Sequence, residues 1–529
     1  MTPSFSRSIR QTGRRALLTA LLVVPPVACT DLTEVPNDAL TPDNAFRTEA
    51  EILAGIASVY ARLRPALWGY YNLSEITTDE MLVPTRGSDW FDNGRWLEIH
   101  RQTWTANSGA ALDDMNGTWN DLFSGVARAN LMIDVIQTAG GTGQEAALAE
   151  LRTLRAFYYF MLQDFFGGLP LVTTTELGQN ARATRQEIFD FIESELLESR
   201  DDLPLTRPAA DYGRMTRGAA NAILASLYVN AGVFTKETGI NATGYNSCND
   251  VTVSGGQNAC QAAVDAADAV INSGVYTLAT DFRSNFSLNN ESSPENIFVT
   301  AYTAVAGLGM SLPMRTLHYN QLSTGGGSPW NGFATLAETY NAFDAADSRR
   351  QMWLVGQQRS FNTGQEVTDR TGKPLVFTPE IQNIEQATEA EGVRYNKFPP
   401  LPDAPNGDGH PNDFPWFRLA EMYLIKAEAL NELGNTGAAL AQVNIVRARA
   451  FEPDEPLAGL SQGALRDAIL DERLFEFAGE AKRRQDLVRH GRYTEARQFK
   501  DQREPYRVLF PIPQVQIQTN PLLTQNSGY

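Results

Sequence analysis

The stretch from Trp416 to Ala450 most restricts the folds open to this chain. Its apolar residues recur at three- and four-residue steps, Gly434 and Asn435 interrupt them, and a second apolar face begins at Leu440. This pattern predicts two α-helices joined by a tight turn. Its small side chains allow the two helices to approach closely, as in a tetratricopeptide helix pair. Because one pair cannot bury both of its faces, further pairs must stack on it.

Further helices are predicted along the chain by the same periodicity. The expected helical segments are residues 48–63, 119–136, 144–166, 185–203, 217–234, 259–272, 463–478 and 481–490. From residue 144 onward these segments pair in chain order, with the stretch that begins at Trp416 as the third pair. The predicted fold class is mainly α, a scaffold of tetratricopeptide-like helix pairs. Residues 46–273 form its N-terminal helical region and residues 274–529 its C-terminal region.

Residues 274–414 interrupt the helical pattern between the second and third pairs. They contain many glycines and two β-leaning runs, at residues 296–300 and 375–377. Residues 68–104 also break the pattern, with aromatic and polar residues that predict loops. We therefore expect a loop-rich, partly β insertion over residues 274–414. Loops carried on a rigid scaffold are a common location for binding residues.

Residues 1–28 have the pattern of a secretory signal peptide, with arginines followed by an apolar run from residue 16 to residue 28. The run is too short to span a bilayer, which takes about 20 residues. Cys29 follows small residues and is predicted to carry the lipid of a bacterial lipoprotein, with residues 29–45 as a lipid-anchored tether. The alternative is ordinary cleavage nearby, with Cys29 incidental. The pair Arg14-Arg15 leaves both the general secretory and the twin-arginine export routes open.

Charge and motif content exclude several classes of function. The formal net charge of −18 argues against a nucleic-acid partner, because most of the surface repels a phosphate backbone. The chain has no Ser-His-Asp, Cys-His or glycine-rich phosphate-binding signature. We therefore predict a protein that is not an enzyme and that uses no cofactor.

Two places in the sequence raise the question of a metal site. Cys248 and Cys260 lie close together in a polar segment of an exported chain, so we expect a disulfide. A metal site is the competing interpretation, but no histidine is nearby in the sequence. Asp403, Asn406 and Asp408 offer oxygen ligands of the kind that calcium prefers. A hairpin turn at residues 406–410 explains the same residues more simply, and no metal is predicted.

The C-terminal part carries the most specific motifs. Residues 465–493 read LRDAILDERLFEFAGEAKRRQDLVRHGRY, and residues 509–529 read LFPIPQVQIQTNPLLTQNSGY. The chain also contains VNIVRARA, WNGF and NAFDAADSRR. Together with the predicted lipidation cysteine and tether, these motifs resemble the SusD/RagB family of nutrient-uptake outer-membrane lipoproteins nearly end to end. The resemblance implies a SusD-like fold.

One family motif, E-x-x-x-E-G-x-R-W-x-D-L, falls on residues 476–487, with Ala481 at the glycine position and Arg484 at the tryptophan position. Acidic and basic residues alternate over residues 471–486 at helical-neighbour spacing. This alternation predicts salt-bridged packing between helices. The alternative is a catalytic carboxylate pair of the glycosidase kind.

Tryptophans point to ligand binding, because five of the eight lie between residues 68 and 119. Aromatic faces offer flat platforms for sugar rings, and nearby polar groups can bond the hydroxyls. The segment TRGSDWFDNGRW, residues 85–96, sets two tryptophans among polar residues, and SPWNGF adds a third. The predicted ligand-binding residues are Trp90, Trp96, Arg86, Asp89, Asn93 and Trp330. The competing interpretation for each tryptophan is packing in the core.

The family resemblance implies a surface-exposed, lipid-anchored protein of the outer membrane that binds an extracellular nutrient, typically a glycan oligomer. It would act as the lid of a TonB-dependent, SusC-like transporter, which would be its protein partner. The alternative is a tetratricopeptide-type scaffold lipoprotein that binds only protein partners, and this predicts buried tryptophan-rich loops. A surface glycoside hydrolase is a third hypothesis, which needs two carboxylates facing a cleft at about 5 to 10 Å.

Overall fold

Helices make up most of the regular structure in this computed structural model, which describes residues 48–139, 144–407 and 409–529. The helices are α1 (Glu49–Tyr60), α2 (Leu63–Glu75), α3 (Arg95–Arg101), α4 (Leu112–Ala139), α5 (Glu145–Phe166), α6 (Arg185–Ser199), α7 (Arg217–Val229), α8 (Ala231–Phe234), α9 (Ala259–Ile271), α10 (Leu312–Thr316), α11 (Ala337–Ala342), α12 (Leu419–Glu432), α13 (Thr436–Arg447), α14 (Gln462–Phe477), α15 (Arg483–Arg489) and α16 (Gln514–Thr519). The strands are β1 (Leu169–Pro170), β2 (Arg182–Ala183), β3 (Asn296–Thr300), β4 (Trp353–Leu354), β5 (Gly356–Gln357), β6 (Val376–Phe377), β7 (Arg394–Tyr395) and β8 (Phe414–Arg418). In the described ranges, none of the helices has both the length and the apolar character needed to cross a bilayer. The predicted signal peptide, Cys29 and the tether lie outside the described residues.

Helices begin where the sequence supplies capping residues. The side chains of Thr48 and Thr184 accept the backbone N–H groups of Glu51 and Glu187, whose carboxylates accept the threonine N–H groups in return. These reciprocal bonds form capping boxes, which satisfy donors that a helix start leaves free. Ser461 caps α14 in a similar way, with its side chain accepting from the backbone of the third helical residue.

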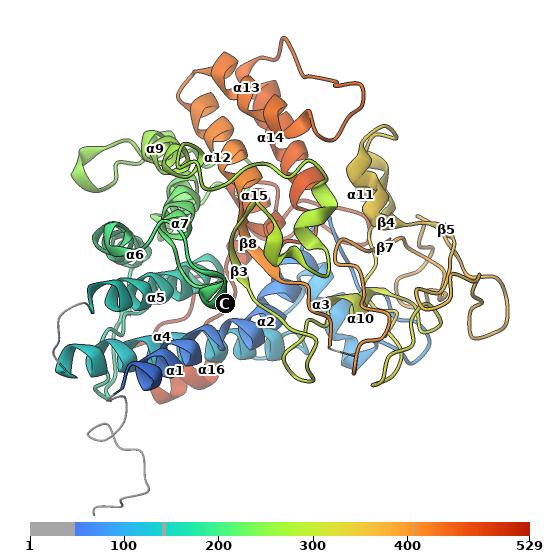
Figure 1. The fold of residues 1–529 in the computed structure, drawn as a ribbon, viewed down its shortest axis with the longest axis horizontal. Helices are drawn as coiled ribbons and strands as arrows, with labels where there is room; N and C mark the ends of the chain where they lie inside the picture. Colours follow the sequence, from blue (N-terminus) through green and yellow to red (C-terminus); the bar gives the residue numbers. More distant parts are fainter. Residues whose placement is uncertain (1–47, 140–143, 408) are drawn as a thin grey trace, which may run out of the picture. The chain divides into compact units, whose positions relative to one another are not determined.

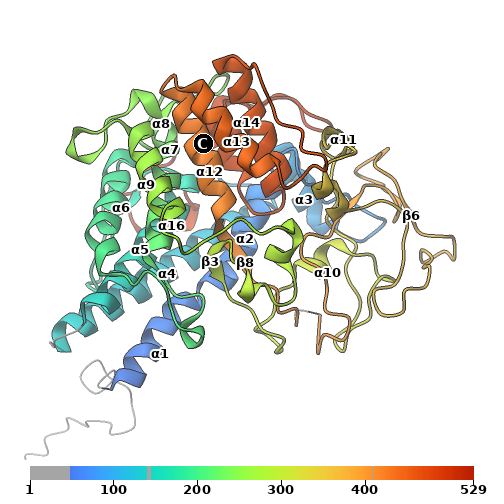
Figure 2. The ribbon, with the colours of Figure 1, turned by 45° about the horizontal axis from the view of Figure 1, so that its top comes forward.

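The predicted helix pairs pack as neighbours. α5 packs on α4 and α6, α7 packs on α9, and α9 packs on α12, which pairs with α13. Figures 1 and 2 show this series, with α12, α13 and α14 at one end of it. α14 also contacts α15, as the sequence predicts. The mainly α fold with stacked helix pairs is therefore confirmed.

Aromatic side chains from distant segments meet in one core. Tyr70 of α2 stacks on Phe165 of α5 with ring centroids 4.5 Å apart. Trp416 of β8 meets Tyr70 at 5.6 Å and Phe157 of α5 at 5.3 Å, both in edge-on contacts. Such contacts add directional stabilisation to the burial of large apolar surfaces. The core thus ties the N-terminal helices to the strand that precedes α12.

The prediction that Trp416 begins a helix is wrong. Residues Phe414–Arg418 form β8, which pairs antiparallel with β3, and α12 starts at Leu419. Every residue of β8 is buried, so its backbone groups need hydrogen-bond partners inside the protein. The β-leaning run at Asn296–Thr300 supplies them.

The prediction of loops throughout residues 68–104 is also wrong. This part of the chain contains the end of α2 and all of α3, with turns between them. Most of α2 is buried, including Tyr70 and Tyr71, and a helix satisfies its own backbone groups in the interior. Pro65 lies in the first turn of α2, where its missing N–H would have no intrahelical partner.

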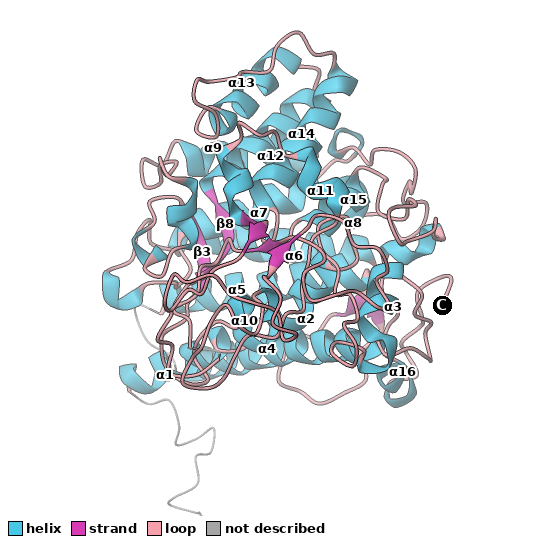
Figure 3. Cartoon of the chain, turned by 90° about the vertical axis from the view of Figure 1, so that its right-hand side faces the viewer, coloured by secondary structure: helices cyan, strands magenta, loops and turns pink. Residues whose placement is uncertain are grey.

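Residues 274–414 form the loop-rich, partly β part that the sequence predicts. Apart from β3, the strands in it are two residues long and pair antiparallel, β4 with β7 and β5 with β6. It also contains two short α-helices, α10 and α11, and 3-10 turns at Phe282–Phe286, Asn290–Ser292 and Ser348–Met352. Figure 3 shows these loops facing the viewer, with longer helices around and behind them.

Arg418, the last residue of β8, is the centre of a buried ionic cluster. Its Nε donates to Glu480 Oε2 at 2.7 Å, and its Nη1 donates to Glu295 Oε1 at 2.6 Å and Glu476 Oε1 at 2.8 Å. Arg349 and Arg449 also pair with Glu476. Burial alone would raise the pKa of Glu476, but the three guanidinium groups hold it well below its ordinary value. We name this cluster the ionic core; its members are Glu295, Arg349, Arg418, Arg449, Glu476 and Glu480.

The salt-bridged packing predicted for residues 471–486 is confirmed, although many of the partners come from other segments. Arg484, at the family's tryptophan position, is fully buried, pairs with Asp164 at 2.8 Å, and lies over the rings of Phe165 and Phe510. Ala481, at the glycine position, has a φ of 59°, in the left-handed region that favours glycine. The fold therefore keeps the backbone conformation of this motif with a residue less suited to it.

Cys248 and Cys260 form a disulfide with an S–S distance of 1.98 Å. Both cysteines are fully buried. The bond links the short turn before residue 251 to the first turn of α9, and it closes the segment between α8 and α9.

Candidate functional site

Four tryptophans form a chain of contacts that joins the N-terminal part to the loop-rich part. Trp68 of α2 lies 6.4 Å from Trp330, ring centroid to ring centroid, and Trp330 lies 6.5 Å from Trp90. Trp90 in turn lies 5.1 Å from Trp96 of α3. Trp90 Nε1 donates to the carbonyl of Trp330 at 2.6 Å across 240 residues of sequence. The fold therefore brings together the three tryptophans predicted as ligand contacts and adds Trp68.

The loop that carries Trp90 is tightly constrained. Trp90, Asp92 and Asn93 all have positive φ values, of 61°, 38° and 56°. Such values are costly outside glycine and occur where surrounding packing imposes them. The packing here is against Gly332, where an added Cβ would come within 2.4 Å of the Trp90 ring. Only glycine at this position leaves room for the tryptophan.

Two predicted ligand contacts are buried. Trp96 is 3% exposed, and its Nε1 donates to Asp92 Oδ2 at 2.6 Å. Arg86 is 2% exposed and donates from Nη1 to the carbonyls of Asn331 and Gly332 at 2.8 and 2.9 Å. Burial lowers the pKa of Arg86 to about 10. Trp96 supports Trp90, and all three guanidinium nitrogens of Arg86 donate to backbone carbonyls, so Arg86 fastens the loop to the turn beyond Trp330. The predicted ligand contact of these two residues stays a prediction.

Asp89 and Asn93 lie at the surface of the same loop. Asp89 accepts the Tyr319 hydroxyl at 2.6 Å and Arg370 Nη2 at 2.8 Å. Asn93 is exposed in the turn before α3. Their predicted role in ligand binding stays a prediction.

A pocket opens beside Trp68 and Trp330, with a volume of about 540 Å³. Such a volume is typical of sites for small molecules and short oligomers. Loop glycines form part of its wall, at Gly307, Gly309, Gly326 and Gly407. We name it the aromatic pocket; the larger side chains that line it are Arg64, Leu67, Trp68, Tyr302, Met310, Leu312, Met314, Arg315 and Trp330.

Trp68 is the clearest aromatic platform of the aromatic pocket, and the sequence did not identify it as a ligand contact. Its side chain is 38% exposed, while Trp330 is partly exposed and tilted by 54° against it. Arg64 and Trp68 lie four residues apart and so share one face of α2. A helix predicted over residues 63–75 would have placed both side chains on the face away from the core. The prediction of loops from residue 68 onward missed this signal.

Behind the aromatic pocket lies a buried carboxyl group. Asp413 is 2% exposed, its Oδ1 accepts the Tyr302 N–H at 2.7 Å, and it hydrogen-bonds the Tyr212 hydroxyl. Burial raises the pKa of Asp413 to about 6, and the nearby Glu291 adds to the rise while Arg64 opposes it. The wall behind Tyr302 therefore changes its charge in mildly acidic conditions.

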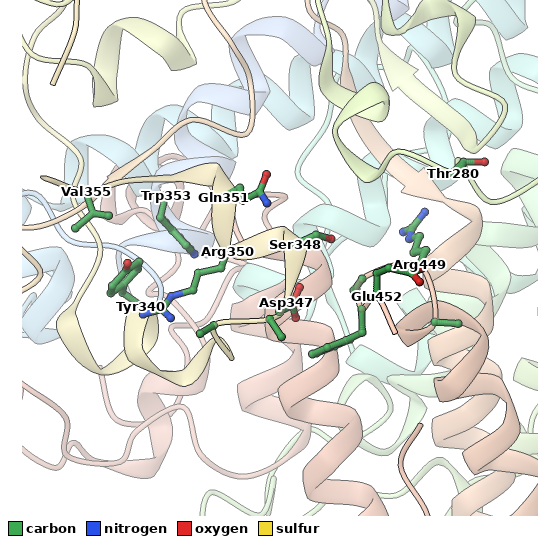
Figure 4. Close-up of a pocket in the computed structure, with 15 residues that line it drawn as sticks. Thr280, Tyr340, Asp347, Ser348, Arg350, Gln351, Trp353, Val355, Arg449 and Glu452 are labelled. Carbon is green, nitrogen blue, oxygen red and sulfur yellow. The ribbon is translucent and has the colours of Figure 1, made fainter. Parts of the chain in front are cut away.

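A second pocket, of about 610 Å³, lies between residues 345–355 and residues 448–452 (Figure 4). Figure 4 shows Arg350 reaching toward Tyr340, and its guanidinium carbon lies 4.5 Å from the centre of that ring. Trp353 is 4% exposed and packs on Tyr395. Trp353 is thus buried, and Arg350 lies over one face of Tyr340, as Arg315 lies over one face of Trp68. The aromatic pocket is a better candidate site than this polar pocket because Trp68 is 38% exposed and Trp330 lies beside it.

No group of three or more His, Cys, Asp or Glu side chains in the described ranges is arranged to hold a metal ion. Gly409 N donates to the carbonyl of Asn406 at 3.1 Å, so the chain turns at this point. Asp408 lies outside the described residues.

Comparison with known proteins gives two family matches. A model described as the SusD family matches residues 242–529, more than half of the chain, and one described as "Starch-binding associating with outer membrane" matches residues 39–229. A SusD-like protein of Formosa agariphila is 24% identical, with 94% of this chain and 96% of that protein covered.

Solved structures share the fold. A SusD superfamily protein from Parabacteroides distasonis has a TM-score of 0.72 at 21% identity, covering 93% of this chain and all of its own. Surface glycan-binding protein A from Bacteroides thetaiotaomicron, in complex with laminarihexaose, has a TM-score of 0.68 at 21% identity, covering 90% of this chain and 99% of its own.

Proposed function

The chain belongs to the SusD family, and from this premise we propose that it is a cell-surface lipoprotein that captures a glycan oligomer in the aromatic pocket. It acts as the lid of a TonB-dependent, SusC-like transporter of the outer membrane. Its role is to capture the glycan without catalysing a reaction on it. Cys29, outside the described residues, is the proposed lipid anchor.

One observation carries the proposal: the rings of Trp68 and Trp330 lie 6.4 Å apart, centroid to centroid, and both line a pocket of about 540 Å³. Sugar rings present C–H faces that pack on aromatic rings, and the polar groups around such rings orient the hydroxyls. The protein described as bound to laminarihexaose has the same fold. A scaffold that binds only protein predicts that the tryptophan-rich loops are buried; in the loop at residues 85–96, Trp96 is 3% exposed, Trp90 is partly exposed and Phe91 is 56% exposed, so the loop is not buried as a whole.

The composition of the aromatic pocket favours binding over hydrolysis. A glycosidase of the usual kind needs two carboxyl groups that flank the scissile bond. None of the described residues that line this pocket is Asp or Glu. A close carboxyl pair does exist at Glu75 and Glu80, where burial raises both pKa values, but at 0% and 1% exposure it is closed to a polymer.

The binding site is tested by titrating a panel of oligosaccharides into the full chain by calorimetry. Trp68→Ala and Trp330→Ala are each expected to weaken binding about tenfold or more, as loss of a central aromatic contact does. Phe91→Ala is the matched control, because Phe91 is 56% exposed and does not line the aromatic pocket. Wild-type affinity in both tryptophan variants would refute this site.

The lid role is tested by purifying the tagged chain from solubilised outer membrane. We expect a TonB-dependent β-barrel in equal amount, and recovery of the chain alone or with a soluble assembly factor would favour the scaffold alternative. Cys29→Ser is expected to abolish labelling by radioactive palmitate and to release the chain from the membrane fraction. Retention of the label would assign the anchor to another residue.

A further inference from the structure

The charged side chains around the aromatic pocket are unusual for this protein. The whole chain has 62 acidic and 44 basic residues, yet the pocket is lined by two arginines, Arg64 and Arg315, and by no acidic residue among those described. The charged side chains of the pocket wall are therefore positive in a chain with a net charge of −18, which suits a negatively charged ligand.

Arg315 has no counter-charge in contact with it. It is 3% exposed, its guanidinium carbon lies 3.6 Å from the centre of the Trp68 ring, and its Nη1 donates to Asn72 Oδ1 at 3.0 Å. The carboxylate whose charge acts on Arg315 is Asp114, which accepts a hydrogen bond from Asn72 Nδ2 and is already paired with Arg95 at 2.5 Å. Within the described ranges, Arg315 forms no salt bridge, and its Nε is buried without an acceptor.

Arg64 is held in place by a neutral partner. Its Nε and Nη2 both donate to the carbonyl of Ala301, at 3.0 and 2.9 Å, and its guanidinium lies 5.8 Å from the Tyr302 ring. The acid that faces it, Asp413, bonds Tyr302 and Tyr212 and forms no salt bridge with it. The bidentate contact fixes the orientation of the guanidinium but leaves its charge unpaired.

A neutral ligand in this pocket would leave the two guanidinium groups in a less favourable electrostatic environment. It would exclude water from Arg64, which is half-buried, and bring no negative charge to Arg315, which is already buried, and keeping a charge away from water without a partner is costly. A carboxylate or a sulfate ester would instead accept charge-assisted hydrogen bonds, which are about twice as strong as neutral ones. The two tryptophan faces would still accept the sugar rings.

We propose that the aromatic pocket selects acidic glycans, with sugar rings on Trp68 and Trp330 and a carboxylate or sulfate ester bound by Arg64 and Arg315. This inference rests on the proposed function, since it takes the aromatic pocket as the glycan site. It adds the chemical class of the glycan.

The test compares three oligosaccharides of equal length by calorimetry with the full chain: an oligogalacturonate, a sulfated galactan oligomer and laminarihexaose. We expect at least one acidic probe to bind about tenfold more tightly than the neutral one, with an affinity that falls as salt rises. The acidic probe that binds tells whether the recognised group is a carboxylate or a sulfate ester.

Arg64→Gln and Arg315→Gln should each remove most of this preference, by lowering the affinity for the acidic probe about tenfold more than the affinity for laminarihexaose. Arg64 is half-buried, so its variant remains informative if the Arg315 variant fails to fold. Arg350→Gln is the matched control, because Arg350 also lies over an aromatic ring without a salt bridge among the described residues, but it lines the polar pocket.

Acidic and neutral probes that bind equally, with both dependent on Trp68, would overturn the acidic preference and leave the proposed function standing. Binding of no probe would overturn both. A preference for acidic probes that survives both arginine variants would overturn the assignment of Arg64 and Arg315.

Discussion

Arg418 of the ionic core and Arg315 of the aromatic pocket are similarly hidden from solvent but differ in their surroundings. Arg418 is 1% exposed and bonds three carboxylates, whereas Arg315 is 3% exposed and bonds an amide and an aromatic face. Burial alone would lower both pKa values, but Glu480, Glu476 and Glu295 raise that of Arg418, while that of Arg315 falls to about 10. The paired charges of the ionic core stabilise the fold, whereas an arginine that lines a pocket without a salt bridge can still pair with a ligand of opposite charge.

The largest effect is expected from breaking the ionic core. Arg418→Leu leaves Glu295, Glu476 and Glu480 without their shared partner and should cost about 3–5 kcal/mol of unfolding free energy, measured in urea. Arg359→Leu is the control, since its pair with Glu366 is exposed and should contribute less than about 1 kcal/mol. Equal losses in the two variants would contradict the structural role of the core.

The pH dependence of stability extends the comparison to a carboxyl group of each region. Burial raises the pKa of Asp413 behind the aromatic pocket, whereas the guanidinium groups of the ionic core lower the pKa of Glu476. With a folded-state pKa of about 6, Asp413 stabilises the fold fully below its unfolded pKa of about 4, and this contribution is lost as the pH rises through 6. The difference in unfolding free energy between wild type and Asp413→Asn should therefore fall by up to about 3 kcal/mol from about pH 4 to pH 7. His100, whose pKa burial lowers to about 4, cancels in this difference because both proteins contain it.

Urea unfolding of the two proteins at several pH values measures that difference. A difference that stays flat with pH would mean that Asp413 titrates normally in the folded state. A difference that grows with pH would mean that a cation pairs with it.

A smaller effect is expected when the charge of the pocket is removed. Arg315→Met loses the hydrogen bond to Asn72 but leaves no buried carboxylate unpaired, so its unfolding free energy should stay within about 1 kcal/mol of wild type. Urea unfolding beside Arg418→Leu gives the contrast directly. A loss as large as that of Arg418→Leu would erase the distinction between the two sets of arginines.

The smallest effect concerns the backbone beside the ionic core. Ala481 has a φ of 59°, so Ala481→Gly should relieve strain and raise the unfolding free energy by up to about 1 kcal/mol. Ala441→Gly, at an exposed position inside α13, should lower it by about the same amount. Thermal unfolding of both variants measures the sign of each change in unfolding free energy. A lower unfolding free energy for Ala481→Gly would mean that the lost methyl contacts outweigh the strain.

The scaffold was predictable because helix periodicity is local. α9 and α14 fall within a residue or two of the predicted ranges, since each has a capping side chain and an apolar face in its own sequence. The strand at Phe414–Arg418 was not predictable in this way. A short, fully buried run has no period that separates strand from helix, and its partner strand lies more than a hundred residues earlier.

The candidate site was predicted only in part, because burial depends on distant segments. Trp90 was identified from its polar neighbours and Trp330 from the Trp-Asn-Gly stretch that the family resemblance includes, and the fold places them together. Arg86 looked available in the sequence, but the carbonyls that hold it come from residues 245 to 305 positions away. Trp68 was missed as a ligand contact because its exposure follows from the face of α2 on which it lies.

The two walls of the aromatic pocket differ in how freely evolution can change them. Trp68 lies on a helix whose other face packs with Tyr70 and Tyr71 in the main core, so changes in that wall disturb the fold. The opposite wall, from Tyr302 to Trp330, is mostly turns around the short helix α10; Met310 and Leu312 belong to the main core, and Met314, Leu317 and Leu322 form a small cluster of their own. Under the proposed function, the turns of that wall outside α10 are therefore where the specificity for a ligand can change at the lowest cost to the fold.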